Sequence, residues 1–157
     1  PRRSDGDIDS LLAARQSARG LKQQAEATPE TWLRRAYFTL IGIPPTPEEI
    51  RAFERASIPD GPGARSAVVE ALLGSAAYGE RWGRHFMDIW RYSDWYGLDP
   101  ELRNSQKHIW RWRDWIIESL NADKGYDRML QEMLAGDELE PENPEVLRAT
   151  GFLARNY

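Results

Sequence analysis

His85 and Asp88 stand three residues apart, which places both side chains on one face of a helix. This pair suits a carboxylate-oriented imidazole that acts as a general base, so His85 is a catalytic candidate. The structural alternative is a half-buried histidine whose ring is satisfied by a carboxylate or a backbone carbonyl. Asp88 and Asp94, set among tryptophans, are a candidate pair for glycoside hydrolysis, which requires one carboxyl to be held neutral by an apolar site.

The second histidine, His108, extends the list of candidate metal ligands. It comes near His85 if the helices that carry the two residues pack as an antiparallel pair, and the two rings would then offer a site for a metal or a non-covalent haem. Two ligands do not define a metal, and the sequence has no cysteine for a thiolate site or a covalent haem. We therefore expect no cofactor in this chain.

The chain contains seven tryptophans, five of which fall on two predicted helices. A buried core is the simpler interpretation of these five: Trp82, Trp90, Trp110, Trp112 and Trp115. A sugar-stacking platform would need exposed indole rings, which favours the loop between the helices. The ligand-binding candidates are therefore in or beside that loop: Trp95, Tyr96, Arg91 and His108.

Arginines and acidic residues alternate around the two tryptophan-rich helices. This interleaving predicts structural ion pairs within and between the helices rather than a catalytic site. The residues are Arg81, Arg84, Arg91, Arg111 and Arg113, with Glu80, Asp88, Asp94 and Asp114.

The apolar spacing and the capping residues predict an all-α fold, an irregular bundle of about seven helices. A long loop without periodicity, Asp94 to Lys107, joins the two tryptophan-rich helices. The fifth helix has a predicted buried stripe that includes Phe86 and Ile89, and apolar residues that include Tyr126 and Leu134 define the seventh. The predicted helices are Ile8 to about Gly20, Pro29 to Leu40, Pro47 to about Ala56, a segment around Val68 to Leu73, Tyr78 to Tyr92, His108 to Leu120, and Tyr126 to Gly136.

The composition, 41% hydrophobic and 29% charged over 157 residues, is typical of one globular domain, residues 1–157. The net charge of −4 comes from interleaved charges, which argues against nucleic acid as a partner. No apolar run approaches the roughly 20 residues of a membrane span. We expect residues 1–7 to be disordered. Because Phe152 and Leu153 stand almost at the end, we expect residues 138–157 to pack on a further part of a larger protein.

Four ordered segments resemble the planctomycete cytochrome-associated family, a PSCyt-type domain of unknown function. The hallmark is GERWGRHFMDIWRYSDWYG, and the others are WLRRAYFTLIGIPPTPEEIRAF, IWRWRDWIIESLNADKGYDRMLQEMLAGD and ATGFLARNY. Together they cover the chain from about Ile8 to its last residue. Phe86 and Trp90 depart from the family's usual residues and bear on packing. The positions that match the hallmark are Arg81, Trp82, His85, Asp88, Arg91, Tyr92, Asp94, Trp110, Arg111, Arg113, Asp114 and Trp115.

The resemblance implies an exported protein, periplasmic or at the cell surface, with several domains. Such proteins typically continue into a C-x-x-C-H motif, so haem c is expected in the parent protein and not in this chain. The leading hypothesis is a non-catalytic module that contacts a cytochrome c domain, the C-terminal remainder of its parent, or a partner chain in electron transfer. The alternative is carbohydrate binding or hydrolysis in polysaccharide breakdown. The family provides no catalytic residues to carry over.

Overall fold

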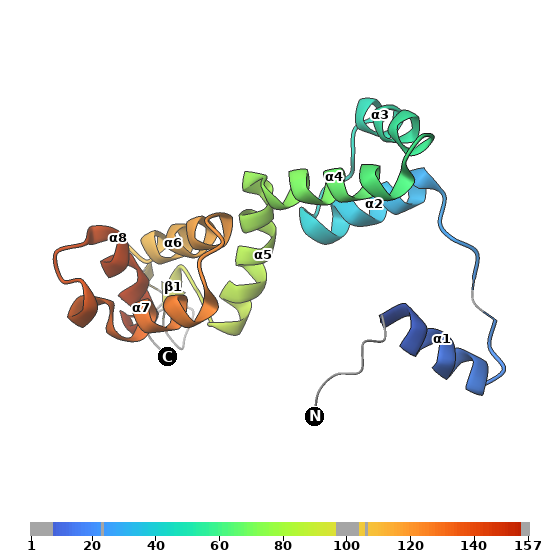
Figure 1. Cartoon of the computed structure of the whole chain (residues 1–157). Helices are drawn as coiled ribbons and strands as arrows, with labels where there is room; N and C mark the ends of the chain where they lie inside the picture. The colour runs from blue at the N-terminus through green and yellow to red at the C-terminus, as the bar shows by residue number, and fades with distance from the viewer. Residues whose placement is uncertain (1–7, 23, 97–103, 106, 155–157) are drawn as a thin grey trace.

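The computed structural model describes residues 8–22, 24–96, 104–105 and 107–154. These residues form a helical protein, which confirms the predicted all-α bundle; the expectation for residues 1–7 lies outside them. The elements are α1 (Ile8–Ala18), α2 (Pro29–Leu40), α3 (Pro47–Ser57), α4 (Gly61–Leu73), α5 (Ala76–Ile89), β1 (Trp95–Tyr96), β2 (Asn104–Ser105), α6 (Trp110–Asn121), α7 (Tyr126–Leu139), α8 (Pro144–Leu147), the 3-10 helix η2 (Arg148–Thr150) and α9 (Gly151–Ala154). Figure 1 shows their arrangement.

Helices α2 to α4 form an N-terminal unit around a small core. Thr28 caps α2 and Thr46 caps α3, and a proline follows each cap at the first helical position, as the sequence predicted. The α3 cap is a complete capping box, with Glu49 bonding back to the Thr46 backbone at 2.7 Å. The buried side chains of this core are Leu33, Tyr37, Phe53 and Leu72.

Helices α5 to α9 form a C-terminal unit, in which α5 packs along α6. Gly79 and Gly83 permit this close approach, because a Cβ on Gly79 would lie 2.6 Å from the carbonyl oxygen of Ile117. The Gly79 amide also donates to the side chain of Asn121 at 2.8 Å. The core of this unit consists mainly of residues from α6 and α7: Trp90, Ile109, Trp112, Trp115, Ile116, Met129, Met133 and Ala149.

The segment after α7 completes this core. Val146 and Ala149 are buried, and the Phe152 ring meets the Trp112 ring edge-on at 5.7 Å. The sequence did not predict α8, η2 or α9, since these elements are too short to show a helical period. The expectation that residues 138–157 pack on a further part of the parent protein stays a prediction, and the described part of the segment packs within this chain.

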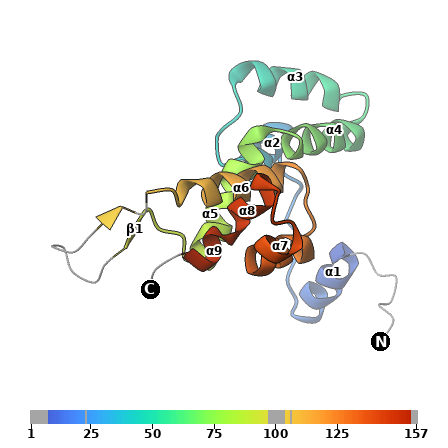
Figure 2. The ribbon, with the colours of Figure 1, turned by 90° about the vertical axis from the view of Figure 1, so that its left-hand side faces the viewer.

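The two units meet where α5 touches α2 and α4. Gly42, which follows α2, has a φ of +76°, and its Cα faces the Arg81 side chain so closely that a Cβ would lie 2.8 Å from Arg81 Cδ. Figure 2 shows the N-terminal helices above α5 and α6. Helix α1 has no buried residue and stands apart in Figure 1. Within the described residues, no helix has the length and apolarity to cross a membrane.

Two predictions about the buried stripes require correction. Trp90, Trp112 and Trp115 are buried, which confirms the core interpretation for them, but Trp110 is 44% exposed. Ile89, expected on the buried stripe of α5, is 70% exposed. Trp110 is the first residue of α6, and Ile89 is the last residue of α5.

Candidate functional site

The hallmark residues after α5 are positioned by a chain reversal at Arg91. This residue has a φ of 56°, in the left-handed region that ends a helix, and the amide of Tyr92 bonds back to the Met87 carbonyl at 2.9 Å. The reversal brings the Tyr92 ring onto α6, 5.8 Å from the Trp112 ring. Arg91 itself, a predicted ligand-binding residue, is exposed.

Tyr92 leads a group of polar residues that we call the Tyr92 cluster: Tyr92, Asp94, Arg113 and Asp114. The Tyr92 hydroxyl donates to Asp94 at 2.6 Å, and the Arg113 Nε donates to Asp114 at 2.9 Å. Burial, followed by the bond to Asp94, raises the pKa of Tyr92, while the bond to Asp114 raises the pKa of Arg113. The raised pKa values keep the Tyr92 phenol protonated and the Arg113 guanidinium charged at neutral pH.

The chain beyond the cluster contains a short antiparallel pairing that the sequence did not predict. β1 pairs with β2, with Trp95 opposite Ser105 and Tyr96 opposite Asn104. Ser93 supports the turn into β1, because its hydroxyl donates to the Trp95 carbonyl at 2.8 Å. Trp95 is 58% exposed beside Asp94. The side chain of Tyr96, the second predicted platform residue, lies outside the described residues.

The predicted catalytic residues are all at the surface. His85 is exposed, with its ring 5.4 Å from the Trp82 ring, so the half-buried histidine of the structural alternative is not observed. Asp88 and Asp94 are also exposed, and Asp94 accepts the bond from Tyr92. Neither carboxylate lies in the apolar surroundings that the hydrolysis hypothesis requires. Their catalytic role stays a prediction.

His108 lies at a different place from His85. It lines a pocket at the start of α6, and His85 is not part of that lining. No group of three or more histidine, cysteine, aspartate or glutamate side chains is arranged for a metal ion in the part of the chain that the structure describes. Of the predicted arginine pairs around α5 and α6, the one that forms among the described residues joins Arg113 to Asp114 at 2.8 Å.

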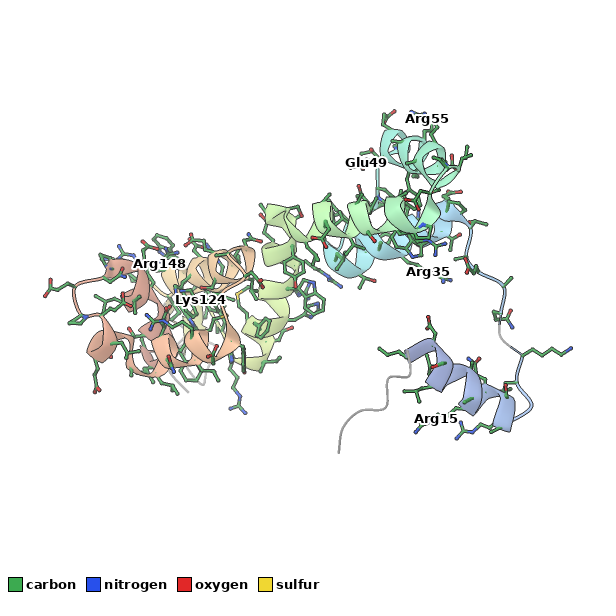
Figure 3. All side chains as sticks on the ribbon, in the orientation of Figure 1. Arg15, Arg35, Glu49, Arg55, Lys124 and Arg148 are labelled. Carbon is green, nitrogen blue, oxygen red and sulfur yellow. The ribbon has the colours of Figure 1, made fainter. Side chains whose placement is uncertain are left out.

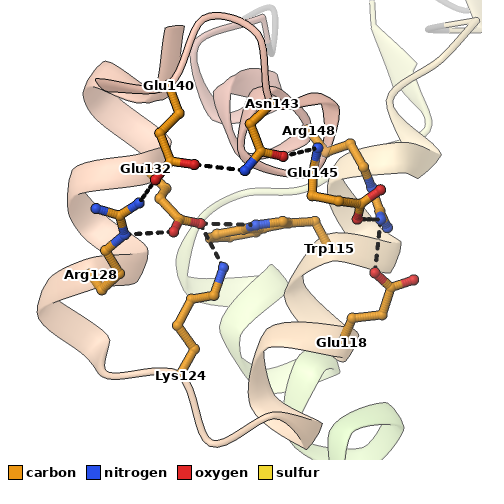
Figure 4. Close-up of polar contacts among 9 residues, drawn as sticks. All are labelled: Trp115, Glu118, Lys124, Arg128, Glu132, Glu140, Asn143, Glu145 and Arg148. Atoms are coloured by element: carbon orange, nitrogen blue, oxygen red, sulfur yellow. Dashed lines mark hydrogen bonds and ion pairs between the residues drawn. The ribbon is translucent and has the colours of Figure 1, made fainter. Parts of the chain in front are cut away.

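A buried ion network in the C-terminal unit was not predicted. The Glu132 carboxylate is buried on α7 and accepts from Lys124 at 2.6 Å, from Arg128 at 2.7 Å and from the indole nitrogen of Trp115 at 3.3 Å (Figure 4). Burial alone would raise the pKa of Glu132, but the bonds and charges of Lys124 and Arg128 lower it below its ordinary value. The available signal was an acidic residue between Met129 and Met133 on the apolar side of a helix.

One comparison with known proteins places this chain in a family. The model of the PSCyt2 family, described as "Protein of unknown function (DUF1549)", matches residues 7–157. Comparisons with curated proteins and with solved structures gave no match. The match includes α1 to α9, the Tyr92 cluster and the Glu132 network.

Proposed function

The chain belongs to the PSCyt2 family of proteins of unknown function, and on this premise we propose that it is a non-catalytic helical module that docks a further protein domain. The expected partner is a cytochrome c domain, in the same exported parent protein or in a separate chain, and the expected process is electron transfer. The docking surface is an apolar face that we call the α5–α7 face: Phe86, Ile89, Tyr126, Leu130 and Leu134.

Exposure of apolar side chains on this face is the observation that carries the proposal. Ile89, which the sequence placed on the buried stripe of α5, is 70% exposed, and Tyr126 and Leu134 on α7 are 53% and 58% exposed. A single exposed apolar residue is ordinary, whereas several on adjoining helices are typical of an interaction surface. A helical stripe that its own chain leaves open is explained if another domain covers it.

Ring contacts join the two helices of the face. The Tyr126 ring lies 6.1 Å from the Phe86 ring and is stacked on the Trp90 ring at 6.4 Å. Tyr126, Leu130 and Leu134 follow one another at four-residue intervals along one side of α7. Phe86 and Leu130 are half-buried against the core and so form a rigid base for the exposed side chains. Aromatic anchors on a rigid base are typical of the energetic centre of a protein interface.

The test measures binding of the 157-residue chain to the cytochrome c domain expected in its parent, by titration calorimetry. Ile89→Glu and Leu134→Glu place charges on the face and should each weaken binding about tenfold or more, because an unpaired carboxylate would be desolvated. Ile58→Glu is the matched control, since Ile58 is 86% exposed on the N-terminal unit.

Absence of binding by the unaltered chain would overturn the proposal. Equal binding by the Ile89 and Leu134 variants would overturn the assignment to the α5–α7 face. Sedimentation equilibrium of the chain alone provides a further check: a dimer that Leu134→Glu dissociates would mean that a second copy, and not a cytochrome domain, covers the face.

A second candidate function, carbohydrate binding, is supported by Trp95. Its exposed indole beside the Asp94 carboxylate offers a stacking surface next to a hydrogen-bond acceptor, the combination that a sugar ring uses. Glycan-array binding should occur and be lost in Trp95→Ala, but not in Trp110→Ala, which removes another exposed indole. Glycan binding that survives Trp95→Ala would remove this candidate.

A further inference from the structure

A pocket of about 490 Å³ opens at the start of α6, away from the residues of the α5–α7 face. One wall consists of residues 107–112, and the other comes from α8, η2 and α9. The volume lies within the range of sites for small molecules, roughly 300 to 1,000 Å³. Neither function proposed above uses this pocket.

The ionisable side chains that line the pocket are all basic: Lys107, His108, Arg111 and Arg148. Lys107 and His108 are exposed and form no ion pair within the part of the chain that the structure describes. The Arg111 guanidinium lies over the Trp110 ring at 5.6 Å and pairs with no carboxylate of the described residues. The rim thus has positive charge to offer to a ligand.

Arg148 holds the second wall in place. Its guanidinium pairs with Glu118 on α6 at 2.8 Å and with Glu145 on α8, and its Nε donates to the Arg111 carbonyl at 3.3 Å. Figure 4 shows Arg148 between these two carboxylates, and Figure 3 places it on the C-terminal unit. Because Glu118 and Glu145 already compensate its charge, Arg148 serves to hold the wall of the pocket. Lys107 and Arg111 remain as the cations that can pair with an anionic ligand.

The interior of the pocket is apolar where it meets the core. Ile109 and Trp112 are buried and Leu147 is half-buried, and all three contribute to the lining. Helix α6 also starts without a side-chain cap, so the positive end of its dipole adds to the charge of the rim. An apolar interior with a cationic rim fits a molecule that has a flat apolar body and one anionic group.

From this lining we infer that the α6 pocket binds a small organic anion, an aromatic carboxylate or sulfonate whose ring system lies against Trp112 and Leu147 and whose charge lies beside Lys107 and Arg111. An acidic peptide offers the same carboxylate. The volume of about 490 Å³ favours the small molecule, because an extended peptide would need a groove that continues past the pocket.

The test uses two fluorescent probes with the same aromatic body. 8-Anilino-1-naphthalenesulfonate carries the anionic group, and N-phenyl-1-naphthylamine lacks it. We expect saturable binding of the sulfonate at one site on the folded chain. The double variant Lys107→Gln/Arg111→Gln should weaken it about tenfold, while binding of the uncharged probe changes little. Arg15→Gln/Lys22→Gln, which removes the same charge on and after α1, is the matched control.

Ala154→Trp tests the position of the site, because Ala154 is exposed at the pocket and a larger side chain there would fill it. It should abolish binding of both probes while circular dichroism remains unchanged. If the control pair Arg15→Gln/Lys22→Gln weakens sulfonate binding equally, the probe is attracted by the general positive charge of the chain. If Ile89→Glu abolishes sulfonate binding, the probe occupies the α5–α7 face. Either result, or unchanged binding in Ala154→Trp, would overturn the inference. Benzoate and an acidic peptide can each be tested as competitors of the sulfonate probe. If the peptide displaces the probe at a lower concentration than benzoate does, the site would be assigned to peptides instead.

Discussion

The N-terminal unit, α2 to α4, and the C-terminal unit, α5 to α9, are stabilised by different means. The first has a small core formed by Leu33, Tyr37, Phe53 and Leu72, and its helices start at caps such as the Thr46 capping box. The second also encloses a charge, because the buried Glu132 carboxylate accepts from Trp115 inside the unit. The family segments around α5 to α9 thus build the core of the C-terminal unit. The Tyr92 cluster, the α6 pocket and the α5–α7 face lie on the surface of that unit.

The largest expected effect is on the core of the C-terminal unit. Trp112→Ala should lower the free energy of unfolding by about 3 to 5 kcal/mol, because it empties the space that Tyr92 and Phe152 share with this ring. Urea unfolding followed by circular dichroism measures the change. Trp110→Ala, two residues earlier and exposed, should change it by less than about 1 kcal/mol. Equal losses in the two variants would refute the assignment of Trp112 to the core.

The buried ion network should give the next effect. Glu132→Gln removes the charge that compensates Lys124 and one of the two carboxylates that pair with Arg128, and we expect a loss of about 2 to 3 kcal/mol, because Lys124 keeps its partly buried position. Glu48→Gln in the N-terminal unit removes an exposed pair with Arg51 and should cost less than about 0.5 kcal/mol. The same urea experiment compares them, and a larger loss for Glu48→Gln would contradict the comparison.

Each unit contains a glutamate whose pKa is lowered in the folded chain. Folding lowers the pKa of Glu132 below 4.5, so its stabilisation is complete above about pH 4.5 and is lost as the pH falls through the lower folded pKa. Urea midpoints should therefore fall on acidification, and Glu132→Gln should remove part of this fall. The pKa of Glu49 in the N-terminal unit is also lowered, chiefly by its bond to the Thr46 backbone, so some acid sensitivity should remain. Identical pH profiles for the variant and the unaltered chain would exclude Glu132 as a source.

The smallest effect belongs to the N-terminal unit. Thr46→Ala removes the hydroxyl that accepts from the Glu49 amide at 3.2 Å, and should cost about 1 kcal/mol. Thr39→Ala, an exposed position within α2, is the control and should change stability by less than about 0.5 kcal/mol. Thermal unfolding by calorimetry measures both. A loss for Thr39→Ala as large as that for Thr46→Ala would show that the cap is not the cause.

Much of the N-terminal unit was predictable because its signals are local. Each of the two helix starts has its hydrogen-bond donor, its acceptor and a proline of fixed φ within four residues. These starts are Thr28 with Pro29, and Thr46 with Pro47 and Glu49. The seven predicted helices are present for the same reason, and their ends lie near those observed except at the start of α4, which is Gly61 and not near Val68. In the C-terminal unit, α8, η2 and α9 were missed because elements of three or four residues have no period.

Side-chain positions in the C-terminal unit were less predictable. Trp110 and Trp112 are alike in sequence terms, but one is exposed and the other buried, because α5 and η2 cover only one side of α6. The burial of Glu132 depends on Lys124 and Arg128 reaching it from two directions. His85 and His108, a candidate pair by residue type, lie at different features of the surface.

The sequence by itself determined the helical class, the capped starts of α2 and α3 and the membership of the hallmark segments in one fold, since these depend on hydrogen bonds and apolar spacing within a few residues. Only the tertiary structure decided which apolar residues stay exposed on the α5–α7 face, that Tyr92 meets Asp94 beside Arg113, and that Lys107 and Arg111 surround an apolar pocket. The physical reason is that burial and charge pairing depend on which helix covers which face, and distant segments determine that covering.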